Sequence, residues 1–232
     1  MKTPMTTIAL TIAVALAGCN ASKPANAADV SLAAASPPAA TAHAHPATPA
    51  ATAVAAPKLQ AGLRTLWHGH VVRTRDYAIA DKAGNEAETA RAADAVVANA
   101  TSLADAVGSF YGPDAGAEML RLLGGHWGGV KALTDAQLRG DEPGVGKAMG
   151  DLMGNGGEIA KFLAAANPNL PENAVLGLLS AHVGHHAAQV QQLYAGDTVA
   201  EAATWIAMQA HMDVLADAMA GAIAKQFPAK AS

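Results

Sequence analysis

Histidines are the residues of this chain whose spacing most clearly permits chemistry. Residues 178–189 read LLSAHVGHHAAQ. His182, His185 and His186 thus fall within five consecutive positions of a mainly apolar stretch. His182 and His186 are four residues apart and share one face of a helix, whereas His185 points about 100° away from His186. A histidine on an apolar face is more often a hydrogen-bonded core residue than a metal ligand, so this stretch must be judged with the rest of the chain.

Three segments of the chain align without a gap at a step of 56 residues. They read LWHGHVVRTRDYAIADKAGN, LLGGHWGGVKALTDAQLRGD and LLSAHVGHHAAQVQQLYAGD. The fifth position of each segment is a histidine, and the same step continues further along each unit. The corresponding residues are His70, His126 and His182, followed by Asn99, Asn155 and His211. We interpret this pattern as the triplication of one helical hairpin.

Composition and turn signals predict an all-α fold. The chain is rich in alanine and leucine and only 4% aromatic. A glycine followed by Asn or Asp at 84–85, 140–141 and 196–197 predicts a helix end and the N-cap of the next helix. We therefore expect an up-and-down bundle of six helices, over roughly 60–82, 86–109, 114–138, 143–165, 172–194 and 198–224. Glycines weaken the fourth helix, since each one inside a helix costs about 0.5–1 kcal/mol relative to alanine.

Counting from the turns places the repeated polar residues at one height in this bundle. His70 precedes Gly84 by 14 residues and Asn99 follows it by 15, so both lie about 21–22 Å from the turn. Their counterparts in the other two units should join the same layer. Because neutral imidazole is the commonest protein metal ligand, we predict a metal site there. Its predicted ligands are His70, His126, His182, His186 and His211, with Asn99, Asn155 and Arg75 as supporting residues outside the ligand set.

The metal is not identified by this pattern. A ferritin-like di-iron site would need Glu-x-x-His pairs, which the chain lacks. The spacing of His182 and His186 occurs in haemerythrin-like sites, but carboxylates are missing from the positions where such sites bridge two irons. An all-imidazole set is chemically suited to zinc or copper, and iron stays among the possible metals. Met208 and Met212 would favour Cu(I) if they were ligands, although methionines at this spacing more often fill a core.

Two other functions are weighed against metal binding. In the first, the histidine and asparagine layer only specifies helix packing, and the protein is a structural or interaction protein. In the second, it is a haemerythrin-like or other metal-dependent enzyme, although no nucleophile with a placed base and no pair of catalytic carboxylates is recognisable. Nucleic acid is not an expected partner, because the net charge is −4 and no basic cluster alternates with aromatic residues.

The N-terminal residues indicate export. The stretch MKTPMTTIALTIAVALAGC has an early positive charge at Lys2 and an apolar run, residues 8–17, too short to span a bilayer. Residues 16–19, Leu-Ala-Gly-Cys, resemble the lipobox of bacterial lipoproteins, which implies cleavage after residue 18 and lipidation of Cys19. Asn20 after the cysteine implies the outer membrane, with the membrane as partner through the lipid. We expect a signal peptide over 1–18, a lipidated and flexible Ala/Pro-rich linker over 19–57 and the helical domain over 58–232.

Several stretches of the domain also resemble one family. The segments LWHGH, LLSAH, FLAAANPNLP and AKQFPAK are similar to an uncharacterised family of bacterial exported all-helical proteins with an L-x-x-H / N-P-N / K-Q-F-P pattern. The resemblance runs from about Leu63 to Lys230. It includes His70, Arg75, His126, Asn155, His182 and His211, and it implies a helical fold without implying a particular activity.

Overall fold

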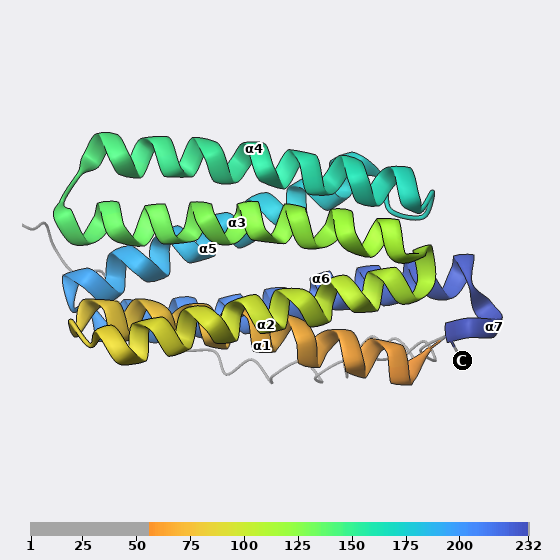
Figure 1. The fold of residues 1–232 in the computed structure, drawn as a ribbon, viewed down its shortest axis with the longest axis horizontal. Coiled ribbons are helices and arrows are strands. Elements are labelled where there is room, and N and C mark those ends of the chain that lie inside the picture. The colour runs from red at the N-terminus through yellow and green to blue at the C-terminus, as the bar shows by residue number, and fades with distance from the viewer. Residues whose placement is uncertain (1–55, 232) are drawn as a thin grey trace, which may run out of the picture. The chain divides into compact units, whose positions relative to one another are not determined.

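The computed structural model describes residues 56–231, which form long helices joined by short connections (Figure 1). The helices are α1 (Pro57–Lys82), α2 (Glu86–Tyr111), α3 (Pro113–Arg139), α4 (Glu142–Ala166), α5 (Glu172–Ala195), α6 (Thr198–Gln226) and the short α7 (Pro228–Ala231). The all-α prediction is confirmed, and each predicted helix ends within three residues of its observed bounds. The predicted signal peptide, Cys19 and most of the linker lie outside the described residues.

The turns within the three hairpins are built alike. Gly84, Gly140 and Gly196 have φ angles of +66°, +64° and +74°, a left-handed conformation that glycine adopts without strain. The next residue, Asn85, Asp141 or Asp197, caps the following helix through its side chain, which accepts a hydrogen bond from a backbone N–H three residues later. These contacts recur at the 56-residue step. Triplication as their origin stays a prediction.

The glycine-rich fourth helix is continuous from Glu142 to Ala166. Most of its glycines meet open space, and Gly156 is the one that is buried, with the Cβ of Leu179 on α5 at 3.7 Å from where its own Cβ would lie. The predicted weakness of this helix is therefore overcome by packing, which routinely overrides local propensity. Among residues 56–231, no helix is both long and apolar enough to cross a membrane.

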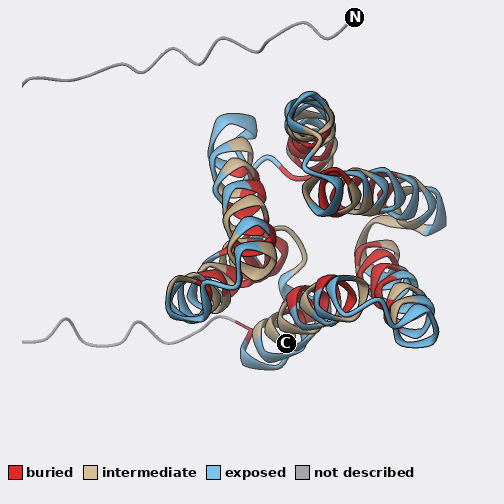
Figure 2. Cartoon of the chain, turned by 90° about the vertical axis from the view of Figure 1, so that its left-hand side faces the viewer, coloured by how far each residue is buried: buried red, intermediate tan, exposed pale blue. Residues whose placement is uncertain are grey.

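The helices pack in an order that closes on itself. Each helix contacts the next along the chain, and α6 returns to contact α1, while α5 also contacts α1 and α3. As a result α2, α4 and α6 each lie between two of the helices α1, α3 and α5. Figure 2 shows that the buried sides of the helices face one another. This arrangement brings equivalent faces of α1, α3 and α5 toward a common interior.

One side-chain contact joins the two helices of every hairpin. Asn99 donates from Nδ2 to the carbonyl of Leu66 at 3.0 Å, and Asn155 donates to the carbonyl of Leu122 at 3.1 Å. In the third hairpin, His211 Nε2 donates to the carbonyl of Leu178 at 2.9 Å. Each accepting carbonyl belongs to the residue four before His70, His126 or His182. The contact therefore fixes the height of these histidines relative to the neighbouring helix.

In the first two hairpins, the asparagine lies close to the glycine just before the histidine, Gly69 or Gly125. A Cβ at Gly125 would lie 3.1 Å from Asn155 Nδ2, whereas a Cβ at the adjacent Gly124 would meet nothing within 4 Å. We expect Gly124→Ala to raise the free energy of unfolding by about 0.5–1 kcal/mol. Gly125→Ala should be less stable than Gly124→Ala by at least about 1 kcal/mol, because the Asn155 hydrogen bond is crowded. Urea denaturation of both variants checks this, and equal stabilities would contradict it.

Candidate metal centre

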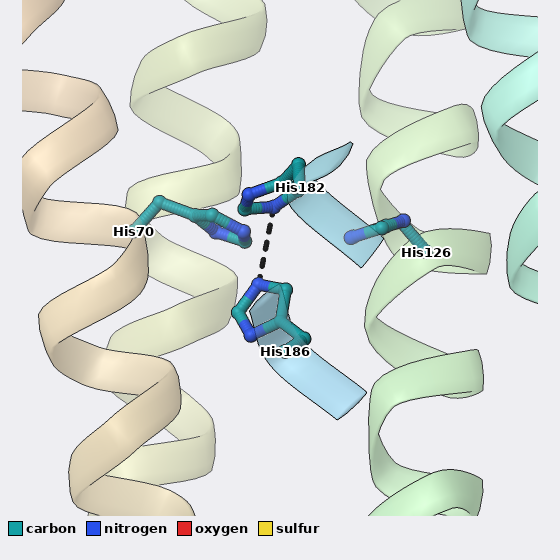
Figure 3. Close-up of side chains that lie close together, drawn as sticks. All are labelled: His70, His126, His182 and His186. Carbon is teal, nitrogen blue, oxygen red and sulfur yellow. Dashed lines mark hydrogen bonds between the residues drawn. The ribbon is translucent and has the colours of Figure 1, made fainter. Parts of the chain in front are cut away.

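Four histidines from three helices converge inside the bundle (Figure 3). The ring centroids of His70 on α1, His126 on α3 and His182 on α5 are 5.5–6.1 Å apart. The fourth ring belongs to His186, one turn further along α5, and its centroid is 4.4 Å from that of His182. One ring nitrogen from each of the four lies within 4.8 Å of the others. None of the four residues is more than 4% exposed.

Most of the ring nitrogens have no hydrogen-bond partner. Both nitrogens of His70 and of His126 are buried and unpaired, as are the Nδ1 atoms of His182 and His186. The only hydrogen bond within the group joins His182 Nε2 and His186 Nε2 at 3.1 Å. Buried polar atoms in folded proteins are nearly always paired, and an unpaired one costs about 1–3 kcal/mol. Six unpaired nitrogens in one place therefore indicate a group that is completed by something else.

Burial keeps these imidazoles uncharged. It lowers the pKa of His70 to about 3, with a smaller contribution from the nearby His126. Burial also lowers the pKa of His126 to about 4, against a smaller opposing effect of the Asn155 side chain. The pKa values of His182 and His186 are likewise well below the ordinary value, first through burial and then through the neighbouring histidines. The neutral form is the one that coordinates metals.

This arrangement could hold a metal ion. Nitrogens bound to a tetrahedral zinc at 2.0–2.1 Å lie about 3.3–3.4 Å apart. The contact between His182 and His186 is already near that spacing, and small ring movements would bring the other two nitrogens in. Within residues 56–231, no Asp or Glu joins the group. The donor set is thus entirely imidazole.

The structure places His211 outside this group. Its ring stacks near that of His182 at a centroid distance of 6.5 Å, but its Nε2 is engaged by the Leu178 carbonyl. Asn99 and Asn155 also direct their Nδ2 groups to backbone carbonyls. The three residues that the sequence places in the histidine layer are therefore at the right height, and their observed role is to join helices.

Arg75, predicted to support the metal site from outside the ligand set, instead pairs with Glu201 on α6. Its guanidinium makes a two-point ion pair with Glu201, with Nε to Oε1 at 2.7 Å, and lies 5.1 Å from the ring centre of Trp205. Glu201 is 5% exposed and also accepts a hydrogen bond from Gln189 at 3.0 Å. The arginine lowers the pKa of Glu201. The sequence analysis did not identify Glu201. One signal could have led to it: Gln189 is a polar residue at a position where the other units have Tyr77 and Leu133.

Met208 and Met212 are fully buried in the main apolar cluster together with Trp67 and Leu215. A second, smaller apolar cluster includes Val130, Leu152 and Val183. The first cluster contains residues that precede the central histidines on α3, and the second contains residues that follow them. The histidine group therefore lies between two apolar regions, which explains its strong burial.

Comparison with known proteins adds no relative: no family model, no curated protein and no solved structure matches the chain. The resemblance to an uncharacterised exported family stays a prediction. The candidate centre is therefore judged on its own geometry.

The buried histidines should make the metal-free protein sensitive to acid. Their folded pKa values lie below the unfolded value near 6.5, so the unfolded chain binds more protons as the pH falls from about 6.5 toward 4. Stability should therefore be greatest above pH 6.5 and fall on acidification. His70→Phe removes one such group and should reduce this slope by up to about 1.4 kcal/mol per pH unit. Urea denaturation at pH 7, 6 and 5 measures it, and identical slopes in both proteins would contradict the assignment.

Proposed function

We propose that the protein binds one transition-metal ion through His70, His126, His182 and His186. The observation that carries the proposal is the convergence of four buried, neutral imidazoles whose ring nitrogens largely lack other partners. Binding would satisfy these nitrogens and replace several unfavourable buried groups by coordination bonds. An ion bound only by the folded chain also adds stability through mass action.

A packing role alone accounts less well for these residues. Side chains that specify helix register are expected to bond to one another or to the backbone with at least one polar atom, as Asn99 Nδ2, Asn155 Nδ2 and His211 Nε2 do here. His70 and His126 make no such bond. Apolar residues of similar volume would fill their positions without leaving unpaired nitrogens. The contrast between the two sets of residues supports ligation by the first.

Four imidazoles and no carboxylate favour zinc or copper, with iron less well suited. A complete set of four protein ligands is typical of closed sites, whereas catalytic zinc sites keep one position for water or substrate. We therefore propose that the site serves to bind or store the ion or to stabilise the fold. Catalysis at an open coordination position is not part of the proposal.

We further propose that the protein is an envelope lipoprotein tethered through Cys19. Support comes from the sequence alone: a short apolar run followed by Leu-Ala-Gly-Cys at 16–19, and an Ala/Pro-rich segment before the helical domain. In that arrangement the bundle would stand in the periplasm, at the end of a linker that starts at the outer membrane.

Metal content of the purified full chain tests the proposed centre. Dialysis against Zn²⁺ followed by elemental analysis should find one ion per chain. His182→Ala should lose the ion and, with it, the thermal stabilisation given by zinc, which reaches about 2.7 kcal/mol at a hundred times the dissociation constant. The matched control is His185→Ala, which removes a half-exposed imidazole outside the group and should retain the ion at equilibrium.

Two results would overturn this function. One is a wild-type chain that takes up neither zinc nor copper at neutral pH. The other is equal metal retention by His182→Ala and His185→Ala, since the bound ion would then lie somewhere other than the four-histidine group.

The anchor is tested separately. Cys19→Ser should move the protein from the membrane fraction to the soluble fraction or leave it unprocessed, because the acceptor for the lipid is lost. Metal content of the variant should be unchanged, since Cys19 precedes the described bundle. A membrane fraction equal to that of the wild type would contradict lipidation at this residue.

A further inference from the structure

A pair of imidazoles lies between the buried group and the surface. His185 on α5 and His211 on α6 are both partly exposed, and their ring centroids are 5.4 Å apart. His211 in turn stacks beside His182, a member of the buried group, at 6.5 Å and an interplanar angle of 16°. Imidazoles therefore follow one another from the partly exposed His185 to the interior.

The backbone contact of His211 determines which of its nitrogens can bind a metal. A carbonyl oxygen only accepts hydrogen bonds, so the Nε2 that faces Leu178 must carry the proton. In the neutral ring, the lone pair is then on Nδ1. Within residues 56–231, no hydrogen bond engages the His185 ring or this Nδ1 of His211, and Nδ1 is not among the buried unpaired atoms. Two nitrogen donors on adjacent helices are thus free for a cation.

The 56-residue step provides two pairs of equivalent positions for comparison in the same molecule. In the first hairpin, the positions of His185 and His211 are occupied by Arg73 and Asn99, and Arg73 donates to the carbonyl of Gly69 at 2.9 Å. A guanidinium at this place repels cations. In the second hairpin, the position of His185 is Gly129, and a Cβ there would lie 2.8 Å from Leu152, whose side chain fills the space. Of the three equivalent pairs, the third alone consists of two imidazoles.

A buried centre needs a route by which its ion arrives, because each of its four ligands is at most 4% exposed. We propose that His185 and His211 form a transit site that captures a divalent transition-metal ion at the surface and passes it to His182. The inference rests on the proposed function, since it concerns how the same centre is loaded. It assigns His211, which lies outside the resting group, a role in the rate of uptake rather than in equilibrium binding.

Two substitutions are chosen to remove the transit site while preserving the contacts between the helices. His211→Asn copies Asn99 and Asn155, so the bond to the Leu178 carbonyl can be kept while the imidazole is lost. His185→Gln replaces a partly exposed ring by an amide. The control is His68→Gln, which removes a histidine with a 31% exposed side chain that bonds Asp213 on α6 and does not contact His211.

The experiment follows transfer of Zn²⁺ from a chromophoric chelator to the metal-free full chain, recording both the rate and the final stoichiometry. We expect the double variant His185→Gln/His211→Asn to load at least about tenfold more slowly, as expected when a nearby capture site no longer raises the local ion concentration. Its final stoichiometry should equal that of the wild type, which also shows that the variant is folded. His68→Gln should load at the wild-type rate.

The other possible results separate the transit role from the proposed metal centre. An unchanged rate in the double variant removes the transit role and leaves the proposed metal centre intact. Loss of equilibrium binding in the double variant would make His185 or His211 a permanent ligand, which also overturns the transit role. If the double variant does not fold, His185→Gln alone decides, and a rate equal to that of His68→Gln refutes the inference. A wild-type chain that takes up no zinc overturns the proposed function and the transit site together.

Discussion

The burial of four uncharged imidazoles between two apolar clusters is the constraint on which the rest of this bundle depends. Each imidazole brings polar nitrogens into a region where no protein group pairs with most of them. Their positions are held by bonds elsewhere: Asn99, Asn155 and His211 join neighbouring helices at the height of the histidines. The surrounding structure thus holds the rings in place without occupying their nitrogens, and this is the condition a metal centre requires.

The 56-residue step in the sequence accounts for three of these histidines and not for the fourth. A hairpin that supplies one inward histidine, repeated three times, necessarily brings three imidazoles together when its copies pack around one interior. His186 has no histidine counterpart, because the same position is Thr74 in the first unit and Val130 in the second. Thr74 bonds back to the carbonyl of His70, and Val130 belongs to the smaller apolar cluster. His186 is therefore a departure from the repeat that brings a fourth imidazole into the buried group.

Sequence reasoning was strongest where a local rule and the repeat agreed. Gly-Asn and Gly-Asp pairs mark the three turns, and the 56-residue step places His70, His126 and His182 at one height, as observed. It was weakest where a side chain could point to either of two neighbours. Whether the His211 side chain faces the other rings or a backbone carbonyl depends on its side-chain torsion angles, which the spacing of residues in the sequence does not determine. The pairing of Arg75 with Glu201 joins residues 126 positions apart, and no periodicity predicts it.

Chemical differences among the three units concentrate in α5 and α6. This hairpin alone carries His185, His186 and His211, and it also supplies Gln189 and Glu201 to the buried network with Arg75. At matching positions of the other two hairpins, Arg73 and Asn155 donate to backbone carbonyls. Two units thus act mainly as a scaffold that positions one histidine each. The third combines that role with the additional imidazoles and charges, so the departures from the 56-residue pattern that carry polar chemistry gather on one pair of helices.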